Sequence, residues 1–210
     1  VYDLDYEKAK ALGQKFIISV FKDPAEAVAI QNCIFDLAIP PSAHHKVLEL
    51  IPENSAVILQ KPMGSNLSEA SNILTLCRQK SLNACVNFQL RFAPMMIALK
   101  DIINKGLIGE IVDIDMWAAL DTPWNLWKFL EDLPRVEILL HSIHYFDAIR
   151  FLVGNPHGVH AKTMGHPASK ISNTRTAAIL DYGEDLRCAV SINHNHNYGR
   201  KYQACELRVC

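Results

Sequence analysis

The sequence lacks a run of apolar residues that approaches the roughly 20 needed to cross a bilayer as a helix. It also lacks an excess of charge of either sign, since 21 Lys and Arg stand against 22 Asp and Glu, whereas nucleic-acid-binding proteins usually have a basic excess. The first residues, Val1-Tyr2-Asp3, do not resemble a secretion signal. These absences lead us to expect a cytoplasmic protein with neither a membrane nor a nucleic acid as its partner.

The six cysteines include no C-x-x-C pair, the spacing typical of zinc sites and redox motifs. Cys33 and Cys85 lie in apolar, strand-like runs, and Cys77 lies on a helical apolar stripe. The sequence therefore favours buried, reduced thiols over disulfides or a zinc site.

Short apolar runs alternate with capped helical patterns over the first 90 residues. Helices are expected to start after Asp5, at Asp23-Pro24, at Ser42 and after Asn66, and strands are expected at residues 16–20, 33–39, 56–59 and 82–88. Strands that are apolar on both faces and separated by helices are typical of a parallel sheet covered on both sides. Residues 1–90 are therefore predicted to form a doubly wound α/β domain.

Residues 91–210 show a different order of elements. A helix from Pro94 to Lys105-Gly106 is followed by a strand at 111–120 and a helix at 137–152, and a hairpin is expected at 174–181 and 186–193. The last of these segments alternates apolar and polar residues, as in a sheet with one face in water. This half is predicted to be an α+β domain with a mainly antiparallel, open sheet.

Two candidate cofactor contacts lie in the first domain. Asp3 follows an apolar run and precedes a helix, where an acidic residue of a dinucleotide-binding fold binds the ribose hydroxyls; a helix-capping role explains it equally well. No arginine follows it directly, which favours NAD over NADP.

Gln60-Lys61-Pro62 follow a strand, and ligands bind at the carboxyl ends of such strands. Lys61 could stabilise an alkoxide as hydride leaves carbon, although most lysines simply lie on the surface.

Glu137, His141, His144 and Asp147 are spaced so that they share roughly one face of a predicted helix. A histidine in a cleft suits general-base catalysis because its ordinary pKa lies near neutrality. The same spacing would allow Glu137, His141 and His144 to bind zinc, and a merely polar helix face is the third possibility. The density of ionisable side chains favours a functional role.

Aromatic and histidine residues give weaker signals. Trp124, in the loop 121–125, could form the rim of a substrate pocket, and Trp117 and Trp127 could stack on sugar rings, although such residues more often pack in a core. His194 and His196 share one face of a strand, and we expect them to be solvated rather than functional.

These pieces occur in an order that resembles the glucose–fructose oxidoreductase and inositol dehydrogenase family (Gfo/Idh/MocA) along nearly the whole chain. The resemblance is carried by Val1-Tyr2-Asp3 with Glu7-Lys8-Ala9, by the segment 38–44, by Gln60-Lys61-Pro62, by Asn87-Phe88 with Arg91-Phe92, Pro94 and 106–110, and by His144-Tyr145-Phe146-Asp147 running into 148–154.

The resemblance implies a Rossmann cofactor domain and a sheet-based domain that carries substrate and often subunit contacts, and so a homo-oligomer. It also implies hydride transfer between a carbinol carbon and the nicotinamide of NAD, with NADP possible. By position, Lys61 would orient the substrate and lower the pKa of its hydroxyl, and His144 would accept the proton. Asp3 would bind the ribose. The remaining implied contacts are Pro40, Pro41, His44 and Gln60 to the cofactor and Arg91, Trp124, His141 and Asp147 to the substrate.

Two positions depart from the family pattern. Gln60 stands where the family usually has glutamate, which removes a negative charge beside Lys61. In the family an aspartate often lies four residues before the catalytic histidine. Four residues before His144 this sequence has Leu140, and His141 or Glu137 could take over the polar role of that aspartate. Both departures leave the substrate open.

The sequence thus predicts an NAD(P)-dependent dehydrogenase that acts on the CH–OH group of a sugar or polyol. A non-catalytic sensor of the same fold is the first alternative, and the presence of both Lys61 and His144 argues against it. A metal-dependent hydrolase or lyase is the second. A glycine-rich loop is expected upstream of Val1, so we expect this chain to be a fragment, without that loop and the C-terminal end, that binds cofactor poorly by itself.

Overall fold

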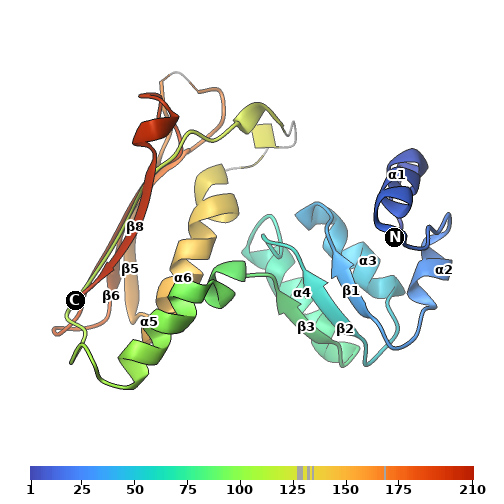
Figure 1. The fold of residues 1–210 in the computed structure, drawn as a ribbon, viewed down its shortest axis with the longest axis horizontal. Coiled ribbons are helices and arrows are strands. Elements are labelled where there is room, and N and C mark those ends of the chain that lie inside the picture. The colour runs from blue at the N-terminus through green and yellow to red at the C-terminus, as the bar shows by residue number, and fades with distance from the viewer. Residues whose placement is uncertain (127–129, 132, 134, 168) are drawn as a thin grey trace. The chain divides into compact units, whose positions relative to one another are not determined.

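The computed structural model describes residues 1–126, 130–131, 133, 135–167 and 169–210. They form two units, Val1–Asn87 and Phe88–Cys210 (Figure 1). The division falls three residues before the predicted boundary between residues 90 and 91. Each unit has its own sheet and its own hydrophobic core, so each is described by itself.

The N-terminal unit contains a parallel sheet in the order β1-β2-β3. Its strands are β1 (Ile34–Leu37), β2 (Ala56–Leu59) and β3 (Asn83–Val86), and its helices are α1 (Tyr6–Phe16), α2 (Pro24–Val28), the short η1 (Pro41–Ala43) with α3 (His44–Leu50), and α4 (Leu67–Gln79). Two strand–helix–strand crossovers with parallel pairing confirm the predicted α/β architecture.

Three of the expected helix starts are confirmed by side-chain caps. The carboxylate of Asp5 accepts a hydrogen bond from the Lys8 amide at 3.3 Å, and that of Asp23 accepts one from the Ala25 amide at 2.8 Å. The Asn66 side chain accepts one from the Glu69 amide at 2.9 Å. These oxygens satisfy amides that have no partner inside the helix.

One face of this sheet forms the core, and the expectation of helices on both faces is not met by the described residues. Leu37, Val57 and Leu59 are buried against Leu48 of α3 and Ile73 of α4. Helices α3 and α4 contact each other and cover the same face, because successive right-handed crossovers along a sequential strand order return on one side. The other face carries exposed side chains such as Ile34, which is 64% exposed.

The strand expected at residues 16–20 is wrong. Helix α1 continues to Phe16, and Ile17 ends it in the left-handed conformation with φ 56°. Ile17 is 94% exposed and Ile18 is 48% exposed, so no burial favours a strand there.

The C-terminal unit has a five-stranded sheet in the order β5-β6-β7-β4-β8. The strands are β4 (Asp113–Ala119), β5 (Gly158–Met164), β6 (Arg175–Asp181), β7 (Arg187–Asn193) and β8 (Ala204–Val209). All neighbours pair antiparallel except β4 and β7, which are parallel. The predicted hairpin is formed by β6 and β7, and the mainly antiparallel sheet is confirmed.

Helices α5 (Pro94–Asn104) and α6 (Ile143–Val153) cover one face of this sheet (Figure 1). Ile149 of α6 packs against the apolar sheet residues Ile114, Met116, Val190 and Ile192, all at most 3% exposed. The opposite face of the sheet includes Trp117, which is 45% exposed.

All six cysteines are free thiols, as predicted. Only Cys77 of the three assigned to apolar runs is buried, since Cys33 is partly buried and Cys85 lies on the uncovered sheet face. No helix within the described ranges is long and apolar enough to span a membrane.

Candidate active site

Gln60 joins the carboxyl ends of the three parallel strands of the N-terminal unit. Its side-chain amide donates to Asp36 Oδ1 of β1 at 2.9 Å, and Asn87, directly after β3, donates to Gln60 Oε1 at 3.1 Å. The three side chains lie on one face of the sheet, as their strand registers require. This amide bridge fixes the backbone immediately before Lys61.

The bridge explains why glutamine is suited to position 60. A glutamate there would have no proton to donate to the Asp36 carboxylate, and two negative oxygens would lie together. Glutamine in place of the family's glutamate is therefore explained by Asp36, whose carboxylate needs a hydrogen-bond donor at position 60. Sequence reasoning named Asn87 only as part of the family resemblance and did not single out Asp36, although their places at strand ends were available as a signal.

We expect Gln60→Glu to lower the free energy of unfolding by on the order of 1 kcal/mol at neutral pH, because it replaces a hydrogen bond by carboxylate repulsion that is partly screened at this exposed edge. Urea unfolding at neutral pH measures it. Adding Asp36→Asn should restore stability, and an undiminished loss in that double variant would contradict the explanation.

Lys61 follows this bridge, and partial burial lowers the pKa of its ammonium group by desolvation.

The loop after β1, with Pro40 and Pro41, leads into α3, where His44 is only 1% exposed. His44 Nδ1 lies 3.0 Å from the Met63 carbonyl, and its Nε2 lies 3.4 Å from the Leu37 carbonyl. His44 thus ties the loop after β1 to the loop that carries Lys61.

Asp3 is exposed, and its Oδ1 accepts a hydrogen bond from the Asp5 amide at 2.8 Å. The N-cap of α1 is Asp5, so helix capping does not explain Asp3. The ribose-binding role of Asp3 therefore stays a prediction, as does the cofactor contact of Lys61 at the carboxyl end of β2.

In the C-terminal unit a π-helical turn, Ile138–Ser142, precedes α6. A π turn adds a residue to the helical repeat and shifts the phase of everything before it. The prediction that Glu137, His141, His144 and Asp147 share one face assumed α-helical spacing throughout, and the π turn alters that spacing from Ile138 to Ser142.

Glu137 is fully buried and holds this turn. It accepts hydrogen bonds from the Ser142 amide at 3.1 Å, from the Ser142 hydroxyl and from the Thr176 hydroxyl. Burial raises the pKa of Glu137 by desolvation, and these donors oppose the increase. His194 Nε2 lies 3.6 Å from Glu137 Oε1.

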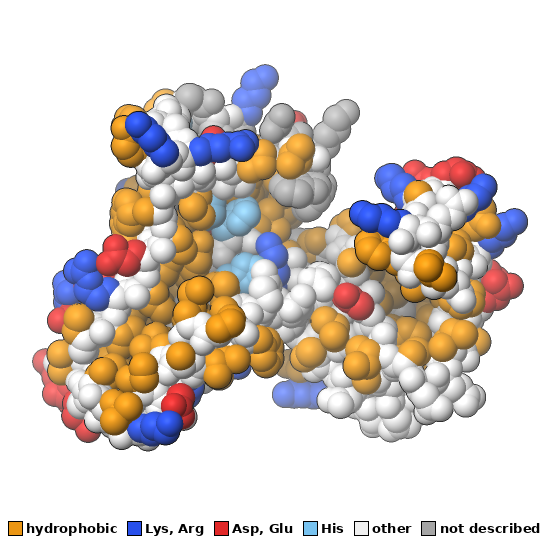
Figure 2. Space-filling model, viewed as in Figure 1, with side chains coloured by type: hydrophobic (Ala, Val, Ile, Leu, Met, Phe, Trp, Pro, Cys, Tyr) orange, Lys and Arg blue, Asp and Glu red, His pale blue; other side chains and the backbone are white. Residues whose placement is uncertain are grey.

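His141 and Trp124 belong to the same cluster. The His141 ring stacks on His194 with centroids 4.4 Å apart, and the Trp124 ring meets His141 edge-on at 5.2 Å. Trp124 is buried and donates from Nε1 to the His194 carbonyl at 3.0 Å. Trp127 lies outside the described residues. Histidine side chains are visible beside α6 in Figure 2.

The expectation that His194 and His196 are solvated is wrong, because they are 1% and 7% exposed. The Thr122 hydroxyl lies 2.7 Å from His194 Nδ1, and His196 Nε2 lies 3.3 Å from the Gly199 carbonyl. The partner of His194 comes from a loop 72 residues away, whereas that of His196 lies three residues on; both allow a polar ring to be buried.

His144 lies on α6 and is 9% exposed. The ring of Phe88 meets it edge-on, with centroids 6.1 Å apart. Asp147, one turn later and 4% exposed, accepts two hydrogen bonds from Arg91, both at 2.6 Å. The structure therefore pairs Arg91 with Asp147 and places Trp124 with His141.

Leu140 is buried in an apolar cluster with Trp124 and Val136, so an aspartate is not accommodated at this position. Among the described residues no group of three His, Cys, Asp or Glu side chains is arranged to hold a metal ion. The ligand set of the metal-dependent alternative, Glu137, His141 and His144, is accordingly not assembled.

We expect Glu137→Ala to lower the free energy of unfolding by about 3 kcal/mol, because it leaves the buried Ser142 amide and two hydroxyls without their acceptor. Chemical denaturation measures the loss. Glu184→Ala, at an exposed turn, is the control and should change stability by less than about 0.5 kcal/mol. Equal effects of the two variants would contradict the structural role of Glu137.

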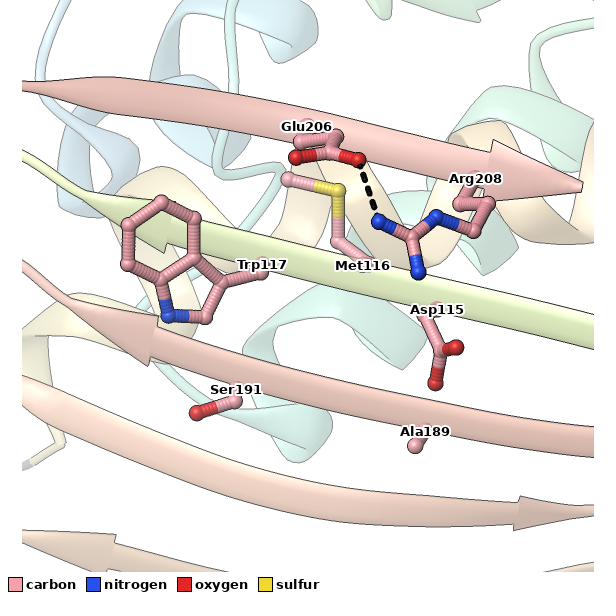
Figure 3. A pocket seen from close by; sticks show the side chains of 7 residues that line it. All are labelled: Asp115, Met116, Trp117, Ala189, Ser191, Glu206 and Arg208. Atoms are coloured by element: carbon pink, nitrogen blue, oxygen red, sulfur yellow. Dashed lines mark hydrogen bonds and ion pairs between the residues drawn. The ribbon is translucent and has the colours of Figure 1, made fainter.

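A shallow cavity of about 370 Å³ lies on the sheet face opposite the helices (Figure 3). Trp117, Asp115, Glu206 and Arg208 surround it, and Arg208 pairs with Glu206 at 3.0 Å. It lies across the sheet from α6 and His144, so it is separate from the candidate catalytic residues of this unit.

The two units have the architecture of a two-domain protein with a Rossmann-like parallel sheet and an open, mainly antiparallel second sheet. Residues 1–88 match the model of the oxidoreductase family with an NAD-binding Rossmann fold, and residues 96–209 match the Gfo/Idh/MocA C-terminal domain. The chain belongs to the Gfo/Idh/MocA oxidoreductase family, and the predicted NAD-binding Rossmann fold is confirmed.

Relatives and solved structures agree with this assignment. D-apiose dehydrogenase of Rhizobium rhizogenes is 24% identical over 95% of this chain and 59% of its own length. An Agrobacterium radiobacter oxidoreductase solved with NAD+, L-tartaric acid and magnesium superposes with a TM-score of 0.84 at 22% identity, covering 99% of this chain and 62% of that one. The Bordetella pertussis WlbA dehydrogenase, solved with NADH and UDP-GlcNAcA, gives 0.81 at 18% identity, covering 99% and 65%. The chain covers between 40% and 59% of the first three curated relatives.

Proposed function

We propose that this chain carries the catalytic residues of a dehydrogenase that transfers hydride between the CH–OH group of a sugar or polyol and NAD. The observation that carries the proposal is Lys61 at the carboxyl end of β2, fixed by the Gln60 bridge in an NAD-binding family. Strand ends of this kind are where dinucleotides and their substrates bind.

The chemistry assigns a separate task to each side chain. Bound NAD+ supplies the acceptor for the hydride. The Lys61 ammonium donates a hydrogen bond to the substrate oxygen and stabilises the negative charge that develops on it as the C–H bond breaks. His144 accepts the hydroxyl proton, so the carbinol becomes a carbonyl while one proton stays on the imidazole. Asp3 accepts hydrogen bonds from the ribose hydroxyls.

A polyol substrate is supported by the chemistry of the relatives, which include a D-apiose dehydrogenase and a structure with a nucleotide sugar. We also assign His141 and Trp124 to substrate binding. Their rings are in contact, with centroids 5.2 Å apart, so the loop that carries Trp124 is held against the π turn that carries His141.

The test measures NADH formation by the protein in its natural full length, with NAD+ and a panel of pentoses, hexoses, sugar phosphates and cyclitols. We expect turnover with at least one polyol and a much weaker rate with NADP+. Binding of NAD+ and a sugar without any turnover would instead favour the sensor alternative, and failure to bind NAD+ would contradict the proposal.

We further propose that the open face of the C-terminal sheet binds a second copy of this chain. Arg208 pairs with Glu206 next to exposed Trp117 (Figure 3), and Arg187 pairs with Asp115 on the same face, so the face carries both charges beside an apolar side chain. Such a face can be complementary to itself about a two-fold axis. Analytical ultracentrifugation should give a dimer or larger species, and Trp117→Glu should give a monomer. An unchanged mass of that variant would reject this face as the interface.

A further inference from the structure

The short helical segment η2 (Gln89–Phe92) is attached to helix α6 by an ion pair with defined geometry. Arg91 Nε donates to Asp147 Oδ2 and Arg91 Nη2 donates to Asp147 Oδ1, both at 2.6 Å. A two-pronged guanidinium–carboxylate pair fixes the plane of both groups as well as their distance. Asp147 is buried whereas the Arg91 side chain is 36% exposed, so solvent screens the pair less than a surface ion pair but does not leave it fully shielded.

The same segment contacts the candidate base. Phe88, the residue that caps η2, meets the His144 ring edge-on at an interplanar angle of 87°. His144 and Asp147 are three residues apart on α6 and therefore lie on the same side of that helix. One short stretch of chain, Phe88 to Arg91, thus contacts both His144 and Asp147.

We propose that Arg91 and Asp147 are positioning residues for His144 rather than contacts to the substrate. The ion pair holds η2 against α6, and Phe88, carried by η2, then limits the orientation of the imidazole. Asp147 is only 4% exposed and both its carboxylate oxygens face Arg91, so burial rather than a lack of lone pairs limits its access to a sugar hydroxyl. This inference rests on the proposed role of His144 as the proton acceptor.

The effect of the pair should appear in kcat. Proton and hydride transfer need the reacting atoms aligned, and a displacement of about 1 Å can cost up to about 100-fold. In the full-length protein we expect Asp147→Asn and Arg91→Lys to lower kcat about 10- to 100-fold while KM changes less than about 3-fold. Asp147→Glu, which keeps the charge, should recover part of kcat. Asp101→Asn, which removes the exposed pair with Lys105, is the matched control and should stay within about 2-fold of the parent.

A double-variant cycle separates positioning from general destabilisation. In a His144→Gln background, Asp147→Asn should cause no further loss, because the side chain that it orients is gone. The same additional loss in both backgrounds, or a raised KM with unchanged kcat, overturns the inference. If His144→Gln itself keeps the parent kcat, the proposed function fails, which is a different outcome.

A spectroscopic measurement keeps the test independent of turnover. The His144 imidazole signal in a proton–carbon correlation spectrum, assigned by its disappearance in His144→Gln, should shift in Asp147→Asn and stay in place in Asp101→Asn. An unmoved signal in folded Asp147→Asn protein overturns the inference. If Asp147→Asn does not fold, the same spectrum of Arg91→Lys decides.

Discussion

Replacing His144 by glutamine in the full-length protein should lower kcat for polyol oxidation by roughly 10²- to 10⁴-fold, the usual contribution of a positioned general base. Glutamine keeps a polar side chain of similar reach but cannot accept a proton near neutral pH. Steady-state NADH formation measures the loss, and NAD+ affinity should be unchanged because His144 is assigned only to the substrate proton.

A matched control shows that the loss belongs to this position. His160→Gln, at an exposed strand position, should keep the parent rate. Parent-like turnover in His144→Gln would remove His144 from the mechanism.

Replacing Lys61 by methionine should lower kcat by about 10²- to 10³-fold, because the developing alkoxide loses a preorganised positive donor. Methionine has a similar length but no charge. Lys46→Met, on the exposed side of α3, is the matched control and should have nearly the parent rate. A fall in NAD+ affinity with unchanged kcat would assign Lys61 to cofactor binding alone.

The lowered pKa of Lys61 also predicts the alkaline side of the profile. The group must be protonated to stabilise the alkoxide, so activity is retained below the folded-state pKa and lost as pH rises through it. Burial lowers the pKa of Lys61 below that of an exposed lysine. The loss of activity should therefore begin at a lower pH than the deprotonation of an exposed lysine would cause. In Lys61→Arg, whose guanidinium stays charged, the residual activity should lack this alkaline limb.

Local sequence patterns predicted most of the fold because they report burial and capping directly. The apolar runs that became β1, β2 and β3 and the caps Asp5, Asp23 and Asn66 each act over a few residues. The strand expected at 16–20 failed because its isoleucines have no core to pack against in the described residues. The parallel pairing of β4 with β7 depends on sheet order, which no local pattern encodes.

The candidate site was only partly predictable for the same reason. Lys61 and His144 were found from motifs, whereas the π turn after Glu137 shifts the helix phase through contacts with Ser142 and Thr176. Thr176 is 39 residues away in sequence, so a helical-face count could not include it. The Arg91–Asp147 pair spans 56 residues and was likewise visible only as two separate charged side chains.

A crystal structure of the full-length protein with NAD+ and a polyol that it oxidises would test the proposed roles of Lys61 and His144. We predict that Lys61 Nζ and one ring nitrogen of His144 both lie within about 3.2 Å of the same substrate hydroxyl oxygen, on the carbon nearest the nicotinamide. A hydroxyl contacted by neither side chain, or by only one, would contradict the proposed mechanism.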